Sequence, residues 1–138
     1  MNLTELSSIF CQNYLFCLRK ASQDLKITLS QALCLITIPF DGISQSKLAK
    51  KLNLDISTLS RNLNNLIKIG IIKKENSDFD KRSYKISLTK SGHQKYKDLT
   101  EMVQNNLNTL FNSLDIHEKD QMIELLNKLN WKFELLNK

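Results

Sequence analysis

The chain carries one segment with the period of a β-strand in a sequence that otherwise follows the period of a helix. In "RSYKISL", residues 82–88, polar and apolar side chains alternate from position 83 onward, which predicts a half-buried strand. "IIKKEN", residues 71–76, forms the other strand of a hairpin, with "SDFDK" as the loop. Because the 138 residues include only 3 Gly and 1 Pro, little room is left for an all-β fold. We therefore expect a mainly α-helical protein with one isolated β-hairpin.

Apolar residues spaced by three and four predict amphipathic helices on both sides of the hairpin. The expected helices span residues 2–23, 28–38, 44–52, 55–69, 89–113 and 115–136. Capping signals mark their ends: the pairs Thr28 with Gln31 and Asp115 with Glu118, the N-cap Asp55, and Gly70 after the fourth helix. The first helix and the last two carry more apolar surface than single helices can hide in water. We expect them to pack together and against a second copy of the chain.

The sequence contains no sign of a membrane segment, a metal site or a cofactor motif. No run approaches 18 consecutive apolar residues, and the N-terminus lacks the basic region of a signal peptide, so we expect a cytoplasmic protein without membrane contact. The three cysteines lack the spacing of a zinc site or a disulfide framework. His93 and His117 are isolated, and we interpret both as surface residues.

Positive charge is concentrated in the middle of the chain. Residues 44–97 hold 13 Lys and Arg against 4 Asp and Glu, a net charge of +9, although the whole chain carries only +6. A basic segment between mildly acidic ends is typical of a surface that meets a polyanion.

The helix expected over residues 55–69 has a polar face suited to nucleic acid. Between Ser57 and Lys68 that face contains Ser, Thr, Arg, Asn and Lys and no acidic residue. Arg and Asn make bidentate contacts to guanine and adenine, and Ser and Thr reach bases or phosphates. The helix over 44–52 precedes it after a three-residue turn, with Lys47 pointing outward. This pair predicts a DNA-binding helix-turn-helix, whereas the alternative is an ordinary solvated helix face.

The hairpin that follows this helix is placed to contact DNA as well. A basic hairpin loop can enter the neighbouring minor groove, where the negative potential of narrow A·T tracts attracts arginine. Arg82 is placed for this contact, and Asp80 can hold its guanidinium by a charge-assisted hydrogen bond. The alternative is an ordinary surface ion pair of little energetic weight.

Residues 48–92 resemble the winged helix-turn-helix core of the MarR family of bacterial transcription regulators. The shared features are "STLSR" at the start of the recognition helix, "GIIKK" at its exit, the D-x-R-S wing tip and the "LTxxG" start of the next helix. The resemblance implies one domain, residues 1–138, with a DNA-binding lobe over 27–92 and helical dimerisation regions over 1–26 and 93–138. It further implies a non-enzymatic repressor that binds a pseudo-palindromic operator as a homodimer.

The resemblance also assigns roles to individual residues. Helix 55–69 would lie in the major groove and wing 72–88 in the minor groove of double-stranded DNA. By position in the motif, the groove contacts are Ser57, Thr58, Ser60 and Arg61, and the wing pair is Asp80 and Arg82. By geometry, the further base or phosphate contacts are Lys47, Asn62, Asn65, Lys73, Lys74 and Lys81.

Two questions stay open at the level of the sequence. The first is whether the chain responds to a signal. The resemblance implies a small phenolic effector bound between the dimerisation helices and the DNA-binding lobe. The alternative is oxidation of Cys11 or Cys17, whose position departs from that of the family's peroxide sensors. The function itself has a second candidate, a winged-helix module that binds protein, which predicts an apolar or acidic patch on helix 55–69. An enzyme is not expected, because no nucleophile–base pair, carboxylate dyad or phosphate loop stands out.

Overall fold

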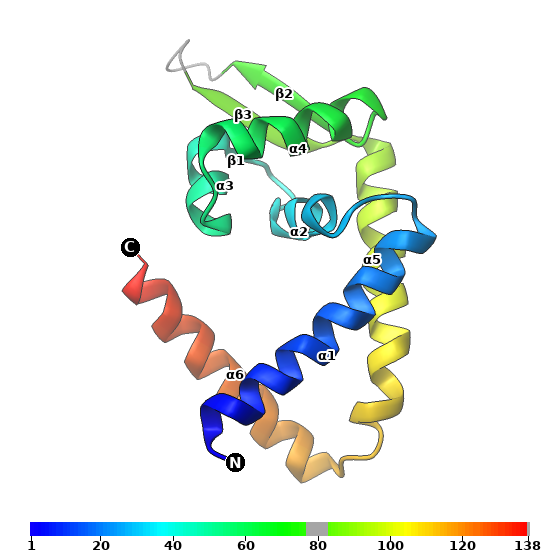
Figure 1. Ribbon diagram of the computed structural model, residues 1–138, viewed down its shortest axis with the longest axis vertical. Helices are drawn as coiled ribbons and strands as arrows, with labels where there is room; N and C mark the ends of the chain where they lie inside the picture. The colour runs from blue at the N-terminus through cyan, green and yellow to red at the C-terminus, as the bar shows by residue number, and fades with distance from the viewer. Residues whose placement is uncertain (77–82, 138) are drawn as a thin grey trace. The chain divides into compact units, whose positions relative to one another are not determined.

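The computed structural model describes residues 1–76 and 83–137, and Figure 1 shows the order of its elements. The elements are α1 (Leu3–Asp24), α2 (Leu29–Thr37), β1 (Ile43–Ser44), α3 (Gln45–Leu52), α4 (Ile56–Lys68), β2 (Ile72–Asn76), β3 (Tyr84–Leu88), α5 (Lys90–Phe111) and α6 (Ile116–Leu136). Contacts divide the chain into two units, Met1–Val103 and Gln104–Lys138. The mainly helical architecture predicted from the sequence is confirmed.

The predicted helix caps are present. The side chains of Thr28 and Asp115 accept a hydrogen bond from the backbone N–H of the residue three positions on. In turn, the side chains of Gln31 and Glu118 accept one from the backbone N–H of Thr28 and Asp115, so both capping boxes are complete. The carboxylate of Asp55 caps α4. Gly70 has φ +76, the left-handed conformation that ends a helix at low cost when the residue is glycine.

The hairpin is not isolated, which corrects the expectation from the sequence. In the described residues the sheet has three antiparallel strands in the order β1-β3-β2. β1 is two residues long and pairs Ile43 with Ile86. A strand this short has no measurable period, and it exists because β3 supplies the hydrogen-bonding partner.

The first unit, Met1–Val103, has a continuous aliphatic core. α2 packs against both α3 and α4, and α4 runs beside the sheet (Figure 1). The fully buried large side chains come from helices and strands alike: Leu18, Leu35, Leu48, Leu59, Leu63, Leu66, Ile72, Ile86 and Leu99. Each such side chain stabilises the fold by roughly 1.5–3 kcal/mol through removal from water. This core fixes the positions of α3, α4 and the sheet relative to one another.

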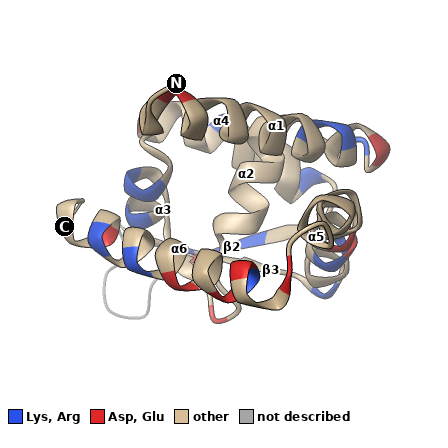
Figure 2. Ribbon diagram, turned by 90° about the horizontal axis from the view of Figure 1, so that it is seen from below, with Lys and Arg blue, Asp and Glu red and all other residues tan. Residues whose placement is uncertain are grey.

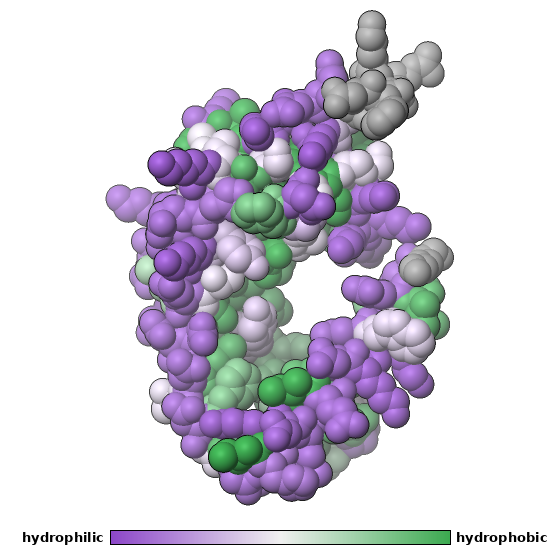
Figure 3. All heavy atoms as spheres, turned by 180° about the vertical axis from the view of Figure 1, so that it is seen from behind, coloured by the Kyte–Doolittle hydropathy of each residue, from purple (hydrophilic) through white to green (hydrophobic). Residues whose placement is uncertain are grey.

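The second unit, Gln104–Lys138, contains the end of α5 and all of α6. No residue of α6 is buried in the single chain, and its apolar stripe includes Leu129 and Phe133 with 61% and 67% of their surfaces exposed. Apolar side chains are visible at the C-terminal end of α6, beside the grey residue 138, in Figure 3. None of the helices in the described part of the chain has the length and apolarity to cross a membrane.

Candidate nucleic-acid interface

The site is built from α3, the turn after it and α4. Asn53 ends α3 with φ +52, a left-handed conformation that asparagine tolerates better than most residues. The two helices pack against each other and bury apolar side chains, Leu48 and Ala49 from α3 and Leu59 and Leu63 from α4. The polar side of α4 and the lysines of α3 therefore remain outside the core.

Asp55 organises the first turn of α4. Its Oδ1 accepts hydrogen bonds from Ser57 Oγ at 2.6 Å and from the backbone N–H of Thr58 at 2.7 Å, and its Oδ2 accepts from Thr58 Oγ1 at 3.0 Å. These bonds lower the pKa of Asp55 to about 2, the Ser57 hydroxyl having the largest effect and attraction by Arg61 adding a small one. The carboxylate is consequently ionised at every physiological pH.

The cap makes a prediction for the pH dependence of stability. Because the pKa of Asp55 is lower in the folded chain than its usual 3.8, its stabilising effect is complete above about pH 4 and disappears as the pH falls through about 2. Asp55→Ala should be less stable than the parent protein at pH 7. The difference, measured by urea unfolding, should shrink between pH 4 and pH 2. Asp41→Ala, at an exposed aspartate before β1, is the matched control for the loss of a carboxylate outside a helix cap.

The predicted contacts on α4 differ in how freely they reach solvent. Ser57, Arg61 and Asn65 are exposed, whereas Thr58, Ser60 and Asn62 are half-buried. The guanidinium of Arg61 donates from Nη2 to Thr58 Oγ1 at 3.5 Å, a distance at which a hydrogen bond is weak. Ile56, an apolar residue of the same first turn, is 50% exposed. The first turn of α4 therefore projects from the core on both sides.

Ser60 has a partner that sequence reasoning missed. Nε2 of Gln45, a buried side chain at the start of α3, donates to Ser60 Oγ at 2.9 Å. The two residues are fifteen positions apart, and no local spacing connects them. Ser60 is thus part of the contact between the two helices as well as a predicted DNA contact.

The strands of the wing present further cations. Lys73 forms an ion pair with Glu75, Nζ to Oε1 at 3.3 Å, and Nζ of Lys74 lies 4.1 Å from the centroid of the Tyr84 ring. Tyr84 is 39% exposed, although its position in the alternating pattern predicted burial, because it lies beyond the core at the outer end of the hairpin. Asp80, Lys81 and Arg82 lie outside the described residues and stay predictions.

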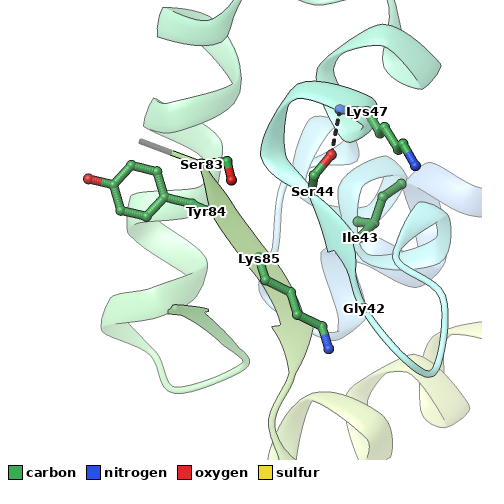
Figure 4. A pocket seen from close by; sticks show the side chains of 7 residues that line it. All are labelled: Gly42, Ile43, Ser44, Lys47, Ser83, Tyr84 and Lys85. Atoms are coloured by element: carbon green, nitrogen blue, oxygen red, sulfur yellow. Dashed lines mark hydrogen bonds between the residues drawn. The ribbon is translucent and has the colours of Figure 1, made fainter. Parts of the chain in front are cut away.

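Basic residues also gather at the edge of the sheet. Figure 2 shows Lys and Arg on α3 and on β2. Between α3, β1 and β3 lies a cavity of about 310 Å³ (Figure 4). Among the residues that the structure describes, its lining contains Lys47 and Lys85 and no acidic residue, and Lys47 donates its backbone N–H to Ser44 Oγ at 3.2 Å. The predicted DNA contact Lys47 thus has a second lysine, Lys85, beside it in the cavity lining. The sequence alone did not indicate Lys85 as part of the site.

The three cysteines occupy different environments. Cys11 is exposed, Cys17 is half-buried and Cys34 is buried. Burial raises the pKa of the Cys34 thiol to about 11, which removes thiolate, the reactive form. No group of three His, Cys, Asp or Glu able to hold a metal occurs within residues 1–76 and 83–137. His93 is half-buried and contacts Phe40, with ring centroids 5.0 Å apart, so it is not fully on the surface.

These environments predict the order of thiol labelling. In the native protein at pH 8, Cys11 should react first with a disulfide reagent such as DTNB. Burial raises the pKa of Cys34 from 9.0 to about 11, so its thiolate fraction at pH 8, and with it the labelling rate, should be about 100-fold lower than for an unburied thiol. Cys34 should become reactive on unfolding in guanidinium. Single-cysteine variants followed by absorbance distinguish the sites. Labelling of Cys34 as rapid as that of Cys11 would contradict the assigned burial.

A helix-turn-helix with a polar second helix, followed by a hairpin that a short strand extends to a sheet, defines the winged helix-turn-helix class. The family model described as MarR family matches residues 27–84, which include α2 to the first residue of β3. Together with the sequence and structural relatives, this match shows that the chain is similar to MarR-family proteins across its winged helix-turn-helix segment.

The relatives include proteins solved with DNA. The transcriptional repressor MprA of Escherichia coli K12 is 31% identical over 88 residues, which are 64% of this chain and 50% of MprA. The chain thus matches about half the length of its curated relatives. Apo MarR from E. coli has a TM-score of 0.80 at 26% identity, covering 94% of this chain and 96% of MarR. A MarR mutant complexed with operator DNA has a TM-score of 0.73 at 26% identity, with 92% of each chain covered.

Proposed function

We propose that the chain is a transcriptional repressor that binds a pseudo-palindromic operator in double-stranded DNA as a homodimer. In each protomer α4 enters the major groove, and the wing, residues 72–88, enters the minor groove. The observation that carries this proposal is the face of α4 with exposed Ser57, Arg61 and Asn65, because these are side chains that read base edges. MarR-family regulators are DNA-binding proteins and not enzymes.

The positive surface around α4 supports the same conclusion. Lys47, Lys50 and Lys51 of α3 are exposed, and Lys85 lines the cavity beside them. Cations arranged around a base-reading helix neutralise phosphates and fix the register of the protein on DNA. The alternative of a protein-binding module predicted an apolar or acidic patch on α4, and its exposed polar face contains an arginine and a lysine instead.

The homodimer is supported by apolar surface on the terminal helices. α6 exposes its stripe along residues 116–136, and α1 exposes Leu3, Leu6, Ile9 and Phe10. Exposed apolar stripes of this kind on a helix mark interaction sites. We assign regions 1–26 and 93–138 to dimerisation and region 27–92 to DNA binding. A regulator of this kind acts in the cytoplasm of a bacterial cell, where its operator lies.

Binding to labelled fragments of the upstream DNA, followed by fluorescence anisotropy at two salt concentrations, tests the proposal. If the dimer neutralises about 6–10 phosphates, the affinity falls about 10³- to 10⁵-fold between 50 and 200 mM salt. Unlabelled fragments of unrelated sequence should compete weakly. Absence of binding to every fragment would favour the protein-binding module instead.

The same assay separates the two candidate signals. Loss of binding on oxidation, reversed by a thiol reductant and absent in Cys11→Ser or Cys17→Ser, would identify a redox sensor. Loss of binding with a phenolic compound such as salicylate, without an oxidant, would identify a small-molecule effector.

A further inference from the structure

The hydroxyl side chains on α4 are held in different hydrogen-bonding states. A hydroxyl group has one proton to donate and two lone pairs that accept. Once a neighbour in the protein takes the proton, the group can only accept from a ligand. Once a neighbour donates to a lone pair and leaves the proton unused, the group can still donate outward.

The hydroxyl groups of Ser57 and Thr58 both donate their hydrogen bonds to Asp55. Ser57 Oγ donates to Oδ1 at 2.6 Å, and Thr58 Oγ1 donates to Oδ2 at 3.0 Å. The aspartate is an obligatory acceptor in its ionised form, and its low pKa of about 2 keeps it in that form. Both hydroxyls therefore present lone pairs, and no proton, to a molecule that approaches α4.

Ser60 has the opposite polarity. Its Oγ accepts from Nε2 of Gln45 at 2.9 Å, and Gln45 is buried with 6% of its surface exposed. Other hydroxyls return their proton to the helix backbone, as Ser22 does to the carbonyl of Leu18. For Ser60 no acceptor is recorded among the residues that the structure describes. Its proton is therefore available to an incoming acceptor.

We propose that α4 reads DNA with hydroxyls of fixed polarity: Ser57 and Thr58 accept from the exocyclic amino group of adenine or cytosine, and Ser60 donates to an acceptor on DNA. This inference rests on the proposed DNA-binding function and adds the chemistry of the readout. In the major groove, adenine N6 and cytosine N4 are the donors. Phosphate oxygens are acceptors, so they cannot pair with Ser57 or Thr58.

The charge of Asp55 favours the same assignment. A carboxylate that faces a phosphate is repelled, whereas one that faces an amino group is attracted. The first turn of α4, with three acceptors at residues 55, 57 and 58, is therefore matched to the amino edge of a base. Asp55 acts here as a positioning residue, because it sets the polarity of its two neighbours.

The test begins with the full chain and a random library of double-stranded DNA, from which the preferred site is selected. Each adenine or cytosine of that site is then replaced by purine or by 2-pyrimidinone, analogues that lack the amino group. At one position per half-site, the parent protein should lose about 2- to 12-fold in affinity for each lost hydrogen bond. The double variant Ser57→Ala with Thr58→Val should bind more weakly and should no longer distinguish the analogue from the natural base.

Two single variants complete the test. Asp55→Asn retains a good helix cap, but its amide NH₂ donates to a neighbouring hydroxyl and releases that hydroxyl's proton. The DNA site selected by Asp55→Asn should therefore prefer guanine or thymine, which present acceptors, at the base that this hydroxyl contacts. Ser60→Ala is the matched control, because it should weaken binding and leave the penalty for the analogue unchanged.

The outcomes separate this inference from the proposed function. Sequence-selective binding that is indifferent to every removed amino group overturns the inference and leaves the function standing. An unchanged base preference in Asp55→Asn, with its fold confirmed by circular dichroism, also overturns it. Absence of sequence-selective binding by the parent protein overturns both.

Discussion

Arg61→Ala is expected to weaken operator binding by about 5- to 150-fold without lowering the melting temperature. The magnitude follows from the loss of one bidentate arginine–guanine contact, about 1–3 kcal/mol. Folding should be unaffected because the side chain is exposed and its recorded hydrogen bond to Thr58 is 3.5 Å long. Exposed substitutions of this kind change stability by about 0.5 kcal/mol or less. Fluorescence anisotropy with operator DNA and a thermal melt measure the two quantities.

A second arginine provides the control for charge. The sequence has three arginines, at positions 19, 61 and 82, and Arg19 is exposed on α1. Arg19→Ala removes the same charge from region 1–26, which we assign to dimerisation, and should leave affinity within about 2-fold of the parent protein, since salt screens exposed charges away from the interface. Arg61→Ala should also relax the preference at one base pair. Equal affinities for Arg61→Ala and the parent protein would remove Arg61 from the interface.

Gly92→Ala is expected to destabilise the fold by about 2 kcal/mol. A Cβ at this position would lie 1.9 Å from the carbonyl oxygen of Ile71 and 3.3 Å from the Cβ of Leu88. The oxygen is held in place because the backbone N–H of Thr89 donates to it at 3.0 Å, and Thr89 Oγ1 donates to the neighbouring carbonyl of Gly70 at 2.5 Å. Alanine gains about 1 kcal/mol in helix propensity, but overpacking typically costs about 1–3 kcal/mol, and a collision this close lies at the upper end.

Urea unfolding measures this loss, and two neighbouring positions calibrate it. Ser91→Ala, at an exposed position of the same turn, should be close to neutral. Gly70→Ala meets no atom within 4 Å but has φ +76, so it should cost only about 1 kcal/mol, the penalty of a left-handed alanine. If Gly92→Ala were as stable as the parent protein, the close approach of Gly92 in α5 to the carbonyl of Ile71, directly before β2, would be incorrect. The clash explains physically why the "LTxxG" pattern at the start of α5 has glycine at its end.

Features that depend on neighbours along the chain could be predicted from the sequence. The capping boxes, the N-cap Asp55, the end of α4 at Gly70 and the two strands of the hairpin all arise from residues within a few positions of each other. Helix and strand periods are local for the same reason. The winged helix-turn-helix class and the basic middle segment followed from these elements and from the order in which they occur.

Features that depend on distant residues were decided only by the tertiary structure. The strand β1 exists because Ile43 meets Ile86, and Ser60 acquires its polarity from Gln45 on another helix. Tyr84 fits the alternating pattern but is exposed, because a period identifies a face and does not show where the core ends. The sequence by itself thus determined which helix carries the polar face. The packing of α3 against α4 decided which of its hydroxyls donate and which accept, since a proton's direction depends on a partner that no local spacing reveals.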